Sequence, residues 1–256
     1  MSKFNVYAFQ KRGDLHPVYC EDFQMALQIH DDFSVFAVMD GCSSGDDSHF
    51  ASALMGKLLH KACKLLEHPA ILKDMNLPER QGPANAKNLS RMLLRLVFEN
   101  LKTARQEMFL NIYEMLSTLL LMVYDHQAHE AYITVKGDGY VAIDGTVHEI
   151  DENDVPRYPA YYLTEDFETW IAAQNYDFYV RSPKDISIAT DGVGTYLTAD
   201  RRPSEKYDPV DLFLNKRGIM KPHMLELKSE LLQKLGLRPL DDVSVIRLIF
   251  DEQQAQ

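Results

Sequence analysis

Acidic residues bound three short apolar runs of this chain. They are Asp40-Gly41 after FSVFAVM, Asp191-Gly192 after DISIAT, and Asp241-Asp242 before VSVIRLIF. Runs of this length that are rich in Val, Ile and Phe are typical of buried β-strands. A buried strand fixes the residue at its end, and carboxylates that converge there repel one another unless a cation neutralises them. If these strand ends converge, the pattern predicts a sheet protein with a metal site at one edge.

Composition and charge exclude several other classes of protein. The chain has 256 residues, 46% of them hydrophobic, which is enough for one sizeable core. We therefore predict a single domain that spans residues 1–256. The formal net charge is −11, and no cluster of Lys and Arg stands out, so a nucleic-acid partner is not expected. The acidic excess suits cation binding, although it is also ordinary for soluble proteins.

No segment of the sequence has the character of a membrane anchor or a secretion signal. The longest apolar stretch, at 118–124, is too short to cross a bilayer, and the first residues lack a signal-peptide core. We expect a cytoplasmic protein with no membrane partner. Its three cysteines lack Cys-x-x-Cys or Cys/His spacing, which fits reduced thiols better than disulfides or a zinc site. Redox control through Cys20 and Cys42 stays open beside the commoner role of a buried thiol.

Hydrophobic periodicity predicts two groups of strands with helices between and after them. Strands are predicted at 23–30, 33–39, 118–124, 131–136, 139–143, 146–150, 177–181, 186–190 and 243–250. Helices are predicted at 48–66 and 90–115, with a loop at 71–88 and a mixed helical insertion at about 208–235. The first two strands form a hairpin.

Strand geometry predicts where the acids lie. In a hairpin, the start of the first strand faces the end of the second, so we expect Glu21 and Asp22 beside Asp40 and Gly41. Other strand ends can reach the same rim of an antiparallel sheet. The acids expected around one cleft are Glu21, Asp22, Asp40, Asp138, Asp191 and Asp241. Oxygen ligands without a histidine cluster favour Mg²⁺ or Mn²⁺, and so many carboxylates suggest two ions.

A turn is the competing interpretation of each Asp-Gly pair, because Gly accepts positive φ and Asp bonds to its own backbone. We assign Asp144-Gly145 entirely to a hairpin turn. A turn explains Asp138-Gly139 about as well as a metal role does. For Asp40, Asp191 and Asp241 together, the bland interpretation requires that three unrelated acids stand at the ends of buried strands by coincidence.

Six segments in order resemble one family. They are YCEDF (19–23), VMDGCSSGDDSHFAS (38–52), STLLLMVY (117–124), VKGDGYVAIDG (135–145), ISIATDGVGTY (186–196) and DDVSVI (241–246). Together they resemble the metal-dependent type 2C protein serine/threonine phosphatases, and the DGCxSG form is similar to a bacterial branch. The resemblance covers nearly the whole chain. It implies an α+β fold, a four-layer sandwich of two face-to-face antiparallel β-sheets flanked by helix pairs, with a helical flap-like insertion at about 196–238.

The resemblance also implies roles for individual residues. Asp40 is similar to the carboxylate that bridges two metal ions, and Asp40 and Asp191 are the residues expected to be indispensable for catalysis. The complete set of expected metal ligands is Glu21, Asp22, Asp40, the Gly41 carbonyl, Asp138, Asp191 and Asp241, with Asp138 at a third, weaker site. The implied reaction is hydrolysis of phosphoserine or phosphothreonine by a hydroxide bridging two Mg²⁺ or Mn²⁺ ions about 3.5 to 4 Å apart. The expected partner is a phosphoprotein substrate, and we expect a monomer.

Two departures from the family pattern leave alternatives open. Many members have an arginine for the substrate phosphate where this chain has Pro17, and the adjacent His16 is the candidate to bind phosphate instead. A histidine that follows the first Asp-Gly in some members is Cys42 here. The alternative is a catalytically weak or inactive regulatory or binding module with the same fold. A metal-dependent nucleotide hydrolase is less favoured, because the sequence has no P-loop.

Overall fold

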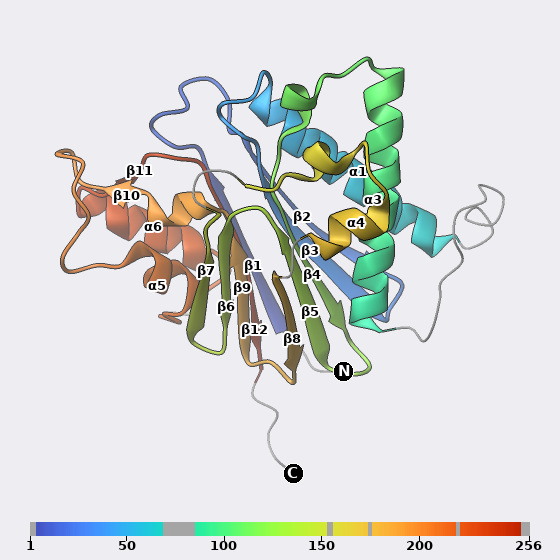
Figure 1. Cartoon of the computed structure of the whole chain (residues 1–256). Helices are drawn as coiled ribbons and strands as arrows, with labels where there is room; N and C mark the ends of the chain where they lie inside the picture. The colour runs from blue at the N-terminus through green and yellow to red at the C-terminus, as the bar shows by residue number, and fades with distance from the viewer. Residues whose placement is uncertain (1–3, 69–84, 153–155, 174–175, 219–220, 252–256) are drawn as a thin grey trace, which may run out of the picture.

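Two five-stranded antiparallel sheets form the centre of the protein (Figure 1). The computed structural model describes residues 4–68, 85–152, 156–173, 176–218 and 221–251. The first sheet, sheet I, has the order β1 (Phe4–Lys11), β12 (Val243–Phe250), β9 (Asp185–Ala189), β6 (Gly139–Ile143), β7 (Thr146–Ile150). The second, sheet II, has the order β2 (Asp22–Ile29), β3 (Phe33–Asp40), β4 (Leu119–Asp125), β5 (Glu130–Lys136), β8 (Tyr176–Arg181).

The two sheets pack face to face. Their shared core joins Val38 and Leu120 of sheet II to Ile188 and Leu248 of sheet I, and all four side chains are fully buried. Because side chains alternate along a strand, the neighbours of Val38 in β3 point to the opposite face of sheet II. β3 and β12 are thus buried on both faces, which explains why their sequences are continuous apolar runs.

Helices cover the outer face of each sheet. α1 (Ser48–Glu67) and α3 (Ala86–Glu107) pack on sheet II, where Leu59 and Leu93 join a core with Val35. The short α4 (Phe167–Ala172) lies beside α3, and Trp170 completes this core. On the other side, α5 (Pro209–Leu214) and α6 (Met224–Lys234) pack on sheet I. The four layers visible in Figure 1 confirm the predicted α+β sandwich with a helix pair on each side.

The paired strands β10 (Tyr196–Leu197) and β11 (Arg238–Pro239) bound the segment that contains α5 and α6, where a helical insertion at about 196–238 was predicted. A buried ion pair anchors it to sheet I. Arg247 of β12 donates from Nε and Nη2 to the carboxylate of Asp185, at 2.8 and 2.7 Å. The same guanidinium donates to backbone carbonyls of Phe213, Asn215 and Lys216 at the end of α5. Bonds to several acceptors compensate for the cost of burying this charge.

The structure corrects the prediction of one continuous helix over 90–115. α3 ends at Glu107, Phe109 has a φ of 56°, and a separate 3₁₀ turn, η1 (Ile112–Met115), follows. Asn111 starts this turn with a capping box, in which its side chain accepts a bond from the Glu114 N–H. The predicted loop at 71–88 lies largely outside the described residues, and its last three residues already belong to α3.

Among the elements that were not predicted are β1 at the edge of sheet I, α4, and the 3₁₀ turn η2 (Pro159–Tyr162). The remaining predicted strands were correct to within one residue at each end. Among the described helices, none combines the length and the apolar character needed to cross a bilayer.

Candidate metal centre

The β2–β3 hairpin brings the first group of acids together. Asp22 and Asp40 are directly opposite each other in the register, and the Gly41 N–H donates to the Glu21 carbonyl at 3.1 Å. The predicted pairing across this hairpin is confirmed. The Asp40 N–H donates to the Thr118 hydroxyl at 2.9 Å, so the start of β4 fixes the end of β3.

The second group of acids comes from sheet I. Asp191 begins the 3₁₀ turn η3 (Asp191–Gly194) directly after β9, and Asp241 and Asp242 directly precede β12. The two segments touch at Gly192, where an added Cβ would overlap the Asp242 carbonyl oxygen. Glycine is therefore required for this close approach.

Thr190 joins the two sheets at this rim. Its hydroxyl donates to Asp22 Oδ2 at 2.8 Å and accepts from the Ser244 N–H at 2.9 Å. Asp22 belongs to sheet II, whereas Ser244 belongs to sheet I and Thr190 directly follows β9 of that sheet. One fully buried side chain thus holds the acidic ends of both sheets side by side.

Electrostatic coupling shows that the acids from the two sheets share one environment. Burial raises the pKa of the Asp40 carboxyl well above its ordinary value, and the charges of Asp22, Asp191 and Asp241 raise it further. Burial, followed by the charges of Asp241 and Asp138, raises the pKa of Asp191 to about 6. Buried carboxylates that repel one another are the environment that a bound cation stabilises.

The same causes act on the other carboxylates of the rim. Burial raises the pKa of Asp22 well above its ordinary value, against the hydrogen bond from Thr190, and the charges of Asp242 and Asp241 add to the rise. Burial also raises the pKa of Asp241. Mutual repulsion thus extends over acids from four separate parts of the chain.

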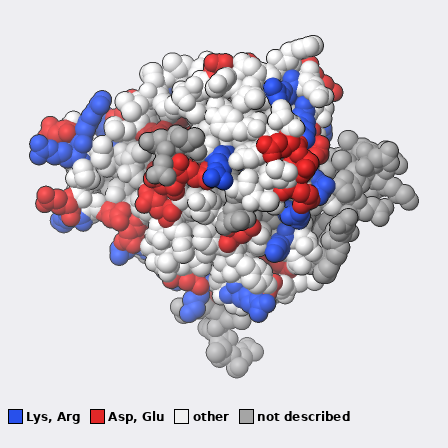
Figure 2. All heavy atoms as spheres, in the orientation of Figure 1, with Lys and Arg blue, Asp and Glu red and all other residues white. Residues whose placement is uncertain are grey.

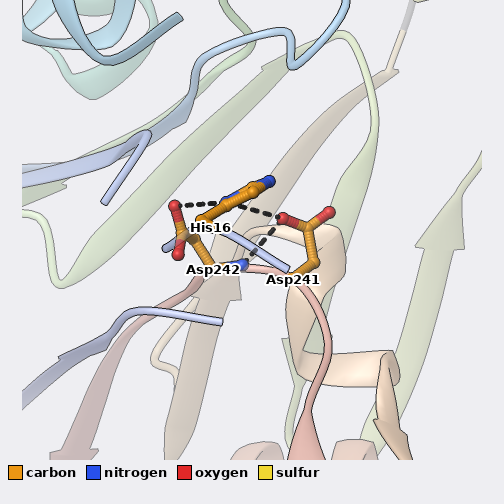
Figure 3. Close-up of side chains that lie close together, drawn as sticks. All are labelled: His16, Asp241 and Asp242. Carbon is orange, nitrogen blue, oxygen red and sulfur yellow. Dashed lines mark hydrogen bonds and ion pairs between the residues drawn. The ribbon is translucent and has the colours of Figure 1, made fainter. Parts of the chain in front are cut away.

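His16 lies between the two carboxylates of the Asp241-Asp242 pair (Figure 3). Its Nδ1 is 2.8 Å from Asp242 Oδ2 and 3.5 Å from Asp241 Oδ1, and its Nε2 is 3.7 Å from Glu21 Oε2. Burial by itself would lower the pKa of His16, but the bond to Asp242 and the neighbouring negative charges raise it above its ordinary value. The neighbouring carboxylates therefore make protonation of His16 easier than it is for a solvated histidine.

His16, Asp241 and Asp242 also form a compact group of potential ligands. One ligand atom from each lies within 4.8 Å of the others, and in the described part of the chain no other trio of His, Cys, Asp or Glu does so. The predicted set of Asp40, Asp191 and Asp241 is therefore less tightly gathered than this trio. The Asp242 carboxylate is already used by the backbone, because it accepts from the N–H groups of Gly13, at 2.7 Å, and Glu21. Asp242 thus anchors the segment before β2, and its neighbour Asp241 is the better candidate ligand.

The two outlying predicted ligands lie on loops at the same rim. Glu21 Oε2 accepts from the Ser43 hydroxyl at 2.9 Å. Asp138 lies between β5 and β6, where its Oδ1 accepts from the Glu152 N–H at 2.8 Å and its charge raises the pKa of Asp191. Glu21 and Asp138 are only partly buried, whereas Asp22 is buried.

Sequence reasoning assigned no role to the Thr190 hydroxyl or the Asp242 carboxylate. Their signals were present as the Thr before Asp191-Gly192 and as the second member of the Asp-Asp pair. Each acts through a contact between distant segments, which spacing in one segment does not reveal.

Two cysteines, Cys20 and Cys42, lie near this rim, and the thiol of Cys20 has little tendency to ionise. Burial, then the charges of Asp22 and Asp242, raises the pKa of the Cys20 thiol to about 12. Cys42 Sγ lies 3.1 Å from the Ser44 hydroxyl. These surroundings give no support to redox control through Cys20.

The donor set fits a hard divalent cation. Asp and Glu side chains gather near the middle of the face shown in Figure 2. The acids offer carboxylate oxygens, which Mg²⁺ and Mn²⁺ prefer, and the compact ligand group of the described residues contains one histidine and no cysteine.

Comparisons with known proteins agree with this architecture. A sequence model of the family described as protein phosphatase 2C matches residues 18–231, well over half of the chain. No curated protein matches the chain.

Several solved structures share the fold at low sequence identity. A bacterial serine phosphatase is 14% identical with a TM-score of 0.61, over 99% of this chain and 100% of that one. RsbX in complex with magnesium is 12% identical with a TM-score of 0.56, over 97% and 96%. For the phosphatase domain of SpoIIE from Bacillus subtilis, with a fragment of its regulatory domain, the identity is 14% and the TM-score 0.57; the match covers 99% of this chain and 65% of that one. At these identities the likeness concerns the fold.

Proposed function

This chain belongs to the protein phosphatase 2C family, and from that premise we propose that it is a metal-dependent protein phosphatase that hydrolyses phosphoserine and phosphothreonine. The observation that carries the proposal is the coupled group Asp22, Asp40, Asp191 and Asp241. These carboxylates lie at the edges of both sheets, Asp22 is buried and the other three are partly buried, and their charges raise one another's pKa. Burial of like charges costs stability, and a divalent cation removes that cost.

We propose that two Mg²⁺ or Mn²⁺ ions are held by this group. The ligands would be Asp40, the Gly41 carbonyl, Asp191 and Asp241, with Glu21 and Asp22 bound directly or through water and Asp138 at a third, weaker site. When bound, such ions supply a water of lowered pKa and neutralise phosphate oxygens.

The chain's own residues supply positioning. Thr190 holds Asp22, and Asp242 holds the backbone of Glu21 and Gly13, so the ligands are oriented before a cation binds. The pKa of His16, which lies at the same rim, is raised by its acidic neighbours. We propose that its imidazolium attracts the substrate phosphate, as an arginine does in other members of the family.

We propose further that the substrate is a phosphoprotein and that the protein is monomeric and cytoplasmic. The acidic surface near the centre gives no basis for binding a nucleic-acid backbone.

Loss of the acidic centre tests the proposed activity. We expect Asp40→Asn and Asp191→Asn each to lower the Mn²⁺-dependent hydrolysis of a phosphoserine peptide at least about a hundredfold, because each removes a charged ligand. A chelator should abolish the wild-type activity. The measurement is phosphate release from a phosphopeptide and from an aryl phosphate, with Mn²⁺ and with chelator.

Asp31→Asn is the matched control, because Asp31 is an exposed aspartate at the opposite end of the same hairpin. It should leave activity unchanged. Undiminished hydrolysis by Asp191→Asn would contradict the assigned centre.

The second candidate is a catalytically inactive regulatory or binding module, and Pro17 in place of the expected arginine favours it. The two candidates differ in one measurement. A module would bind Mn²⁺ without hydrolysing any phosphopeptide, nucleotide or aryl phosphate. Hydrolysis of nucleotides alone would instead favour the nucleotide hydrolase.

A further inference from the structure

A separate cavity of about 360 Å³ lies on the outer side of sheet II. It is enclosed by α3, α4, β5 and the start of β8, and it contains none of the proposed metal ligands. Its volume falls at the lower end of the range of small-molecule sites. The polar and charged residues that line it are Lys87, Ser90, Arg91, Tyr132, Thr134, Lys136, Glu168 and Asp177.

Ser90 lines this cavity with an unsatisfied hydroxyl. Its side chain is fully buried, and its Oγ finds no hydrogen-bond partner among the described residues. Most buried hydroxyls are hydrogen-bonded, and one left without a partner lowers stability. A ligand atom in the cavity would give this hydroxyl a partner.

β5 lines the opposite wall with three polar side chains. Tyr132, Thr134 and Lys136 are two residues apart, so they point to the same face of the strand, the outer face of sheet II. Lys136 is 1% exposed, and its Nζ lies 5.6 Å from the centre of the Trp170 ring. Burial lowers the pKa of this ammonium to about 8, against the charges of Asp177 and Glu152. An ammonium has three N–H donors, so it can contact a ligand in addition to the partners that it already has.

The lining carries an excess of positive charge. Lys87, Arg91 and Lys136 face two carboxylates, Glu168 and Asp177. Glu168 is already bound by Arg91 and by Arg95, a further cation outside the lining. Figure 2 shows Lys and Arg side chains along this side of the molecule, interspersed with Asp and Glu side chains. The balance favours an anionic ligand.

We propose that this cavity binds a small molecule through an anionic group, phosphate or carboxylate. The anion lies between the Ser90 hydroxyl and the Lys136 ammonium, with Lys87 and Arg91 at the entrance. The proposal does not depend on the phosphatase activity, since the cavity and the acidic centre share no residue.

The chain's one tryptophan gives the binding test a local signal, because Trp170 lies against Lys136. We expect inorganic phosphate or malonate to change Trp170 fluorescence saturably at millimolar concentration. The protein is kept in chelator, so that phosphate cannot bind through divalent ions at the acidic centre. The two probes distinguish a phosphate site from a carboxylate site.

Substitutions in the lining make the test specific. Ser90→Ala and Lys87→Ala should each weaken binding about tenfold, since each removes a hydrogen bond or a charge that contacts the anion. Lys136→Met should abolish binding, and if that variant does not fold, the first two still decide. Arg105→Ala, which removes a cation of α3 outside this cavity, should bind as the wild type does.

Two results would overturn the proposal. One is a wild-type fluorescence signal that does not saturate with either probe. The other is equal affinity in the wild type, Ser90→Ala and Lys87→Ala. Neither result bears on the phosphatase assay, which requires divalent ions and a phosphopeptide.

Discussion

Thr190 shows how much a single side chain contributes to the acidic centre. Its hydroxyl bonds to Asp22 of sheet II and to the backbone of Ser244 of sheet I. Asp22 is buried, and its other oxygen, Oδ1, has no partner among the described residues. The hydroxyl of Thr190 is therefore the main neutral group that satisfies this carboxylate.

Removal of that hydroxyl should destabilise the metal-free protein. We expect Thr190→Val to lower the free energy of unfolding by about 1 to 3 kcal/mol, because it leaves a buried carboxylate and a buried N–H without their partner. Urea unfolding in chelator measures the change. Thr190→Ser, which keeps the hydroxyl, should lose less than half as much, and equal losses in both variants would assign the effect to packing.

At the scale of elements, the centre depends on how closely η3 approaches the start of β12. Gly192 allows this approach, since a side chain there would overlap the Asp242 carbonyl. The segment cannot retreat freely, because Asp241 N–H donates to the Thr195 hydroxyl at 3.1 Å and Leu240 N–H to the Thr195 carbonyl at 3.2 Å.

Gly192→Ala should therefore separate Asp191 from Asp241. We expect a loss of about 1 to 3 kcal/mol in stability from the overlap, together with weaker Mn²⁺ binding. Calorimetric titration with Mn²⁺ measures the second effect. Gly236→Ala is the comparison, because Gly236 has a φ of 80° but open space around it, so it should cost about 1 kcal/mol and leave Mn²⁺ affinity intact.

The sequence predicted best those elements whose run of apolar residues directly reflects their burial. β3 and β12 are buried on both faces, and Asp144-Gly145 adopts positive φ at both residues, as a tight hairpin turn requires. The helix at 90–115 was predicted too long because Met108 and Ile112 continue the apolar spacing of α3. The break depends on Phe109 and Asn111, whose conformations spacing does not encode.

At the scale of the whole molecule, the centre is shared between two sheets. Asp22 and Asp40 belong to sheet II, whereas Asp191 and Asp241 adjoin strands of sheet I. A cation bound by both groups links the two sheets, so its binding energy adds to the stability of the entire fold.

Mn²⁺ should consequently raise the free energy of unfolding of the wild type, by about 2.7 kcal/mol at a concentration 100 times its Kd. Binding requires ionised carboxylates, and the pKa of Asp191 is raised to about 6. Because the pKa values of Asp22 and Asp40 are raised as well, the stabilisation should decline as the pH falls towards 6 and through it. Thermal unfolding with and without Mn²⁺ over this pH range measures it. Stabilisation that persists in Asp191→Asn, or that does not change with pH, would count against the assigned ligands.

The location of the centre could be predicted because it lies where apolar strands end in Asp. The ends of β3, β9 and β12 are recognisable in the sequence, and antiparallel pairing explains why Asp22 lies beside Asp40 in sheet II and why the end of β9 lies beside the start of β12 in sheet I. The packing that brings the two rims together is not encoded in any one segment. The partners of His16 could not be predicted in this way. They depend on how the segment between β1 and β2 folds back onto Asp242, which no local pattern encodes.

The pairing of β1 with β12 has a consequence for synthesis of the protein. β12 lies between β1 and β9, and the proposed ligand Asp241 lies two residues before it, so both sheet I and the proposed cation site are incomplete until β12 has left the ribosome. A nascent chain that ends before this point would lack Asp241 even though most of its residues had been made. On the proposed function, hydrolysis would therefore begin only after translation has passed β12.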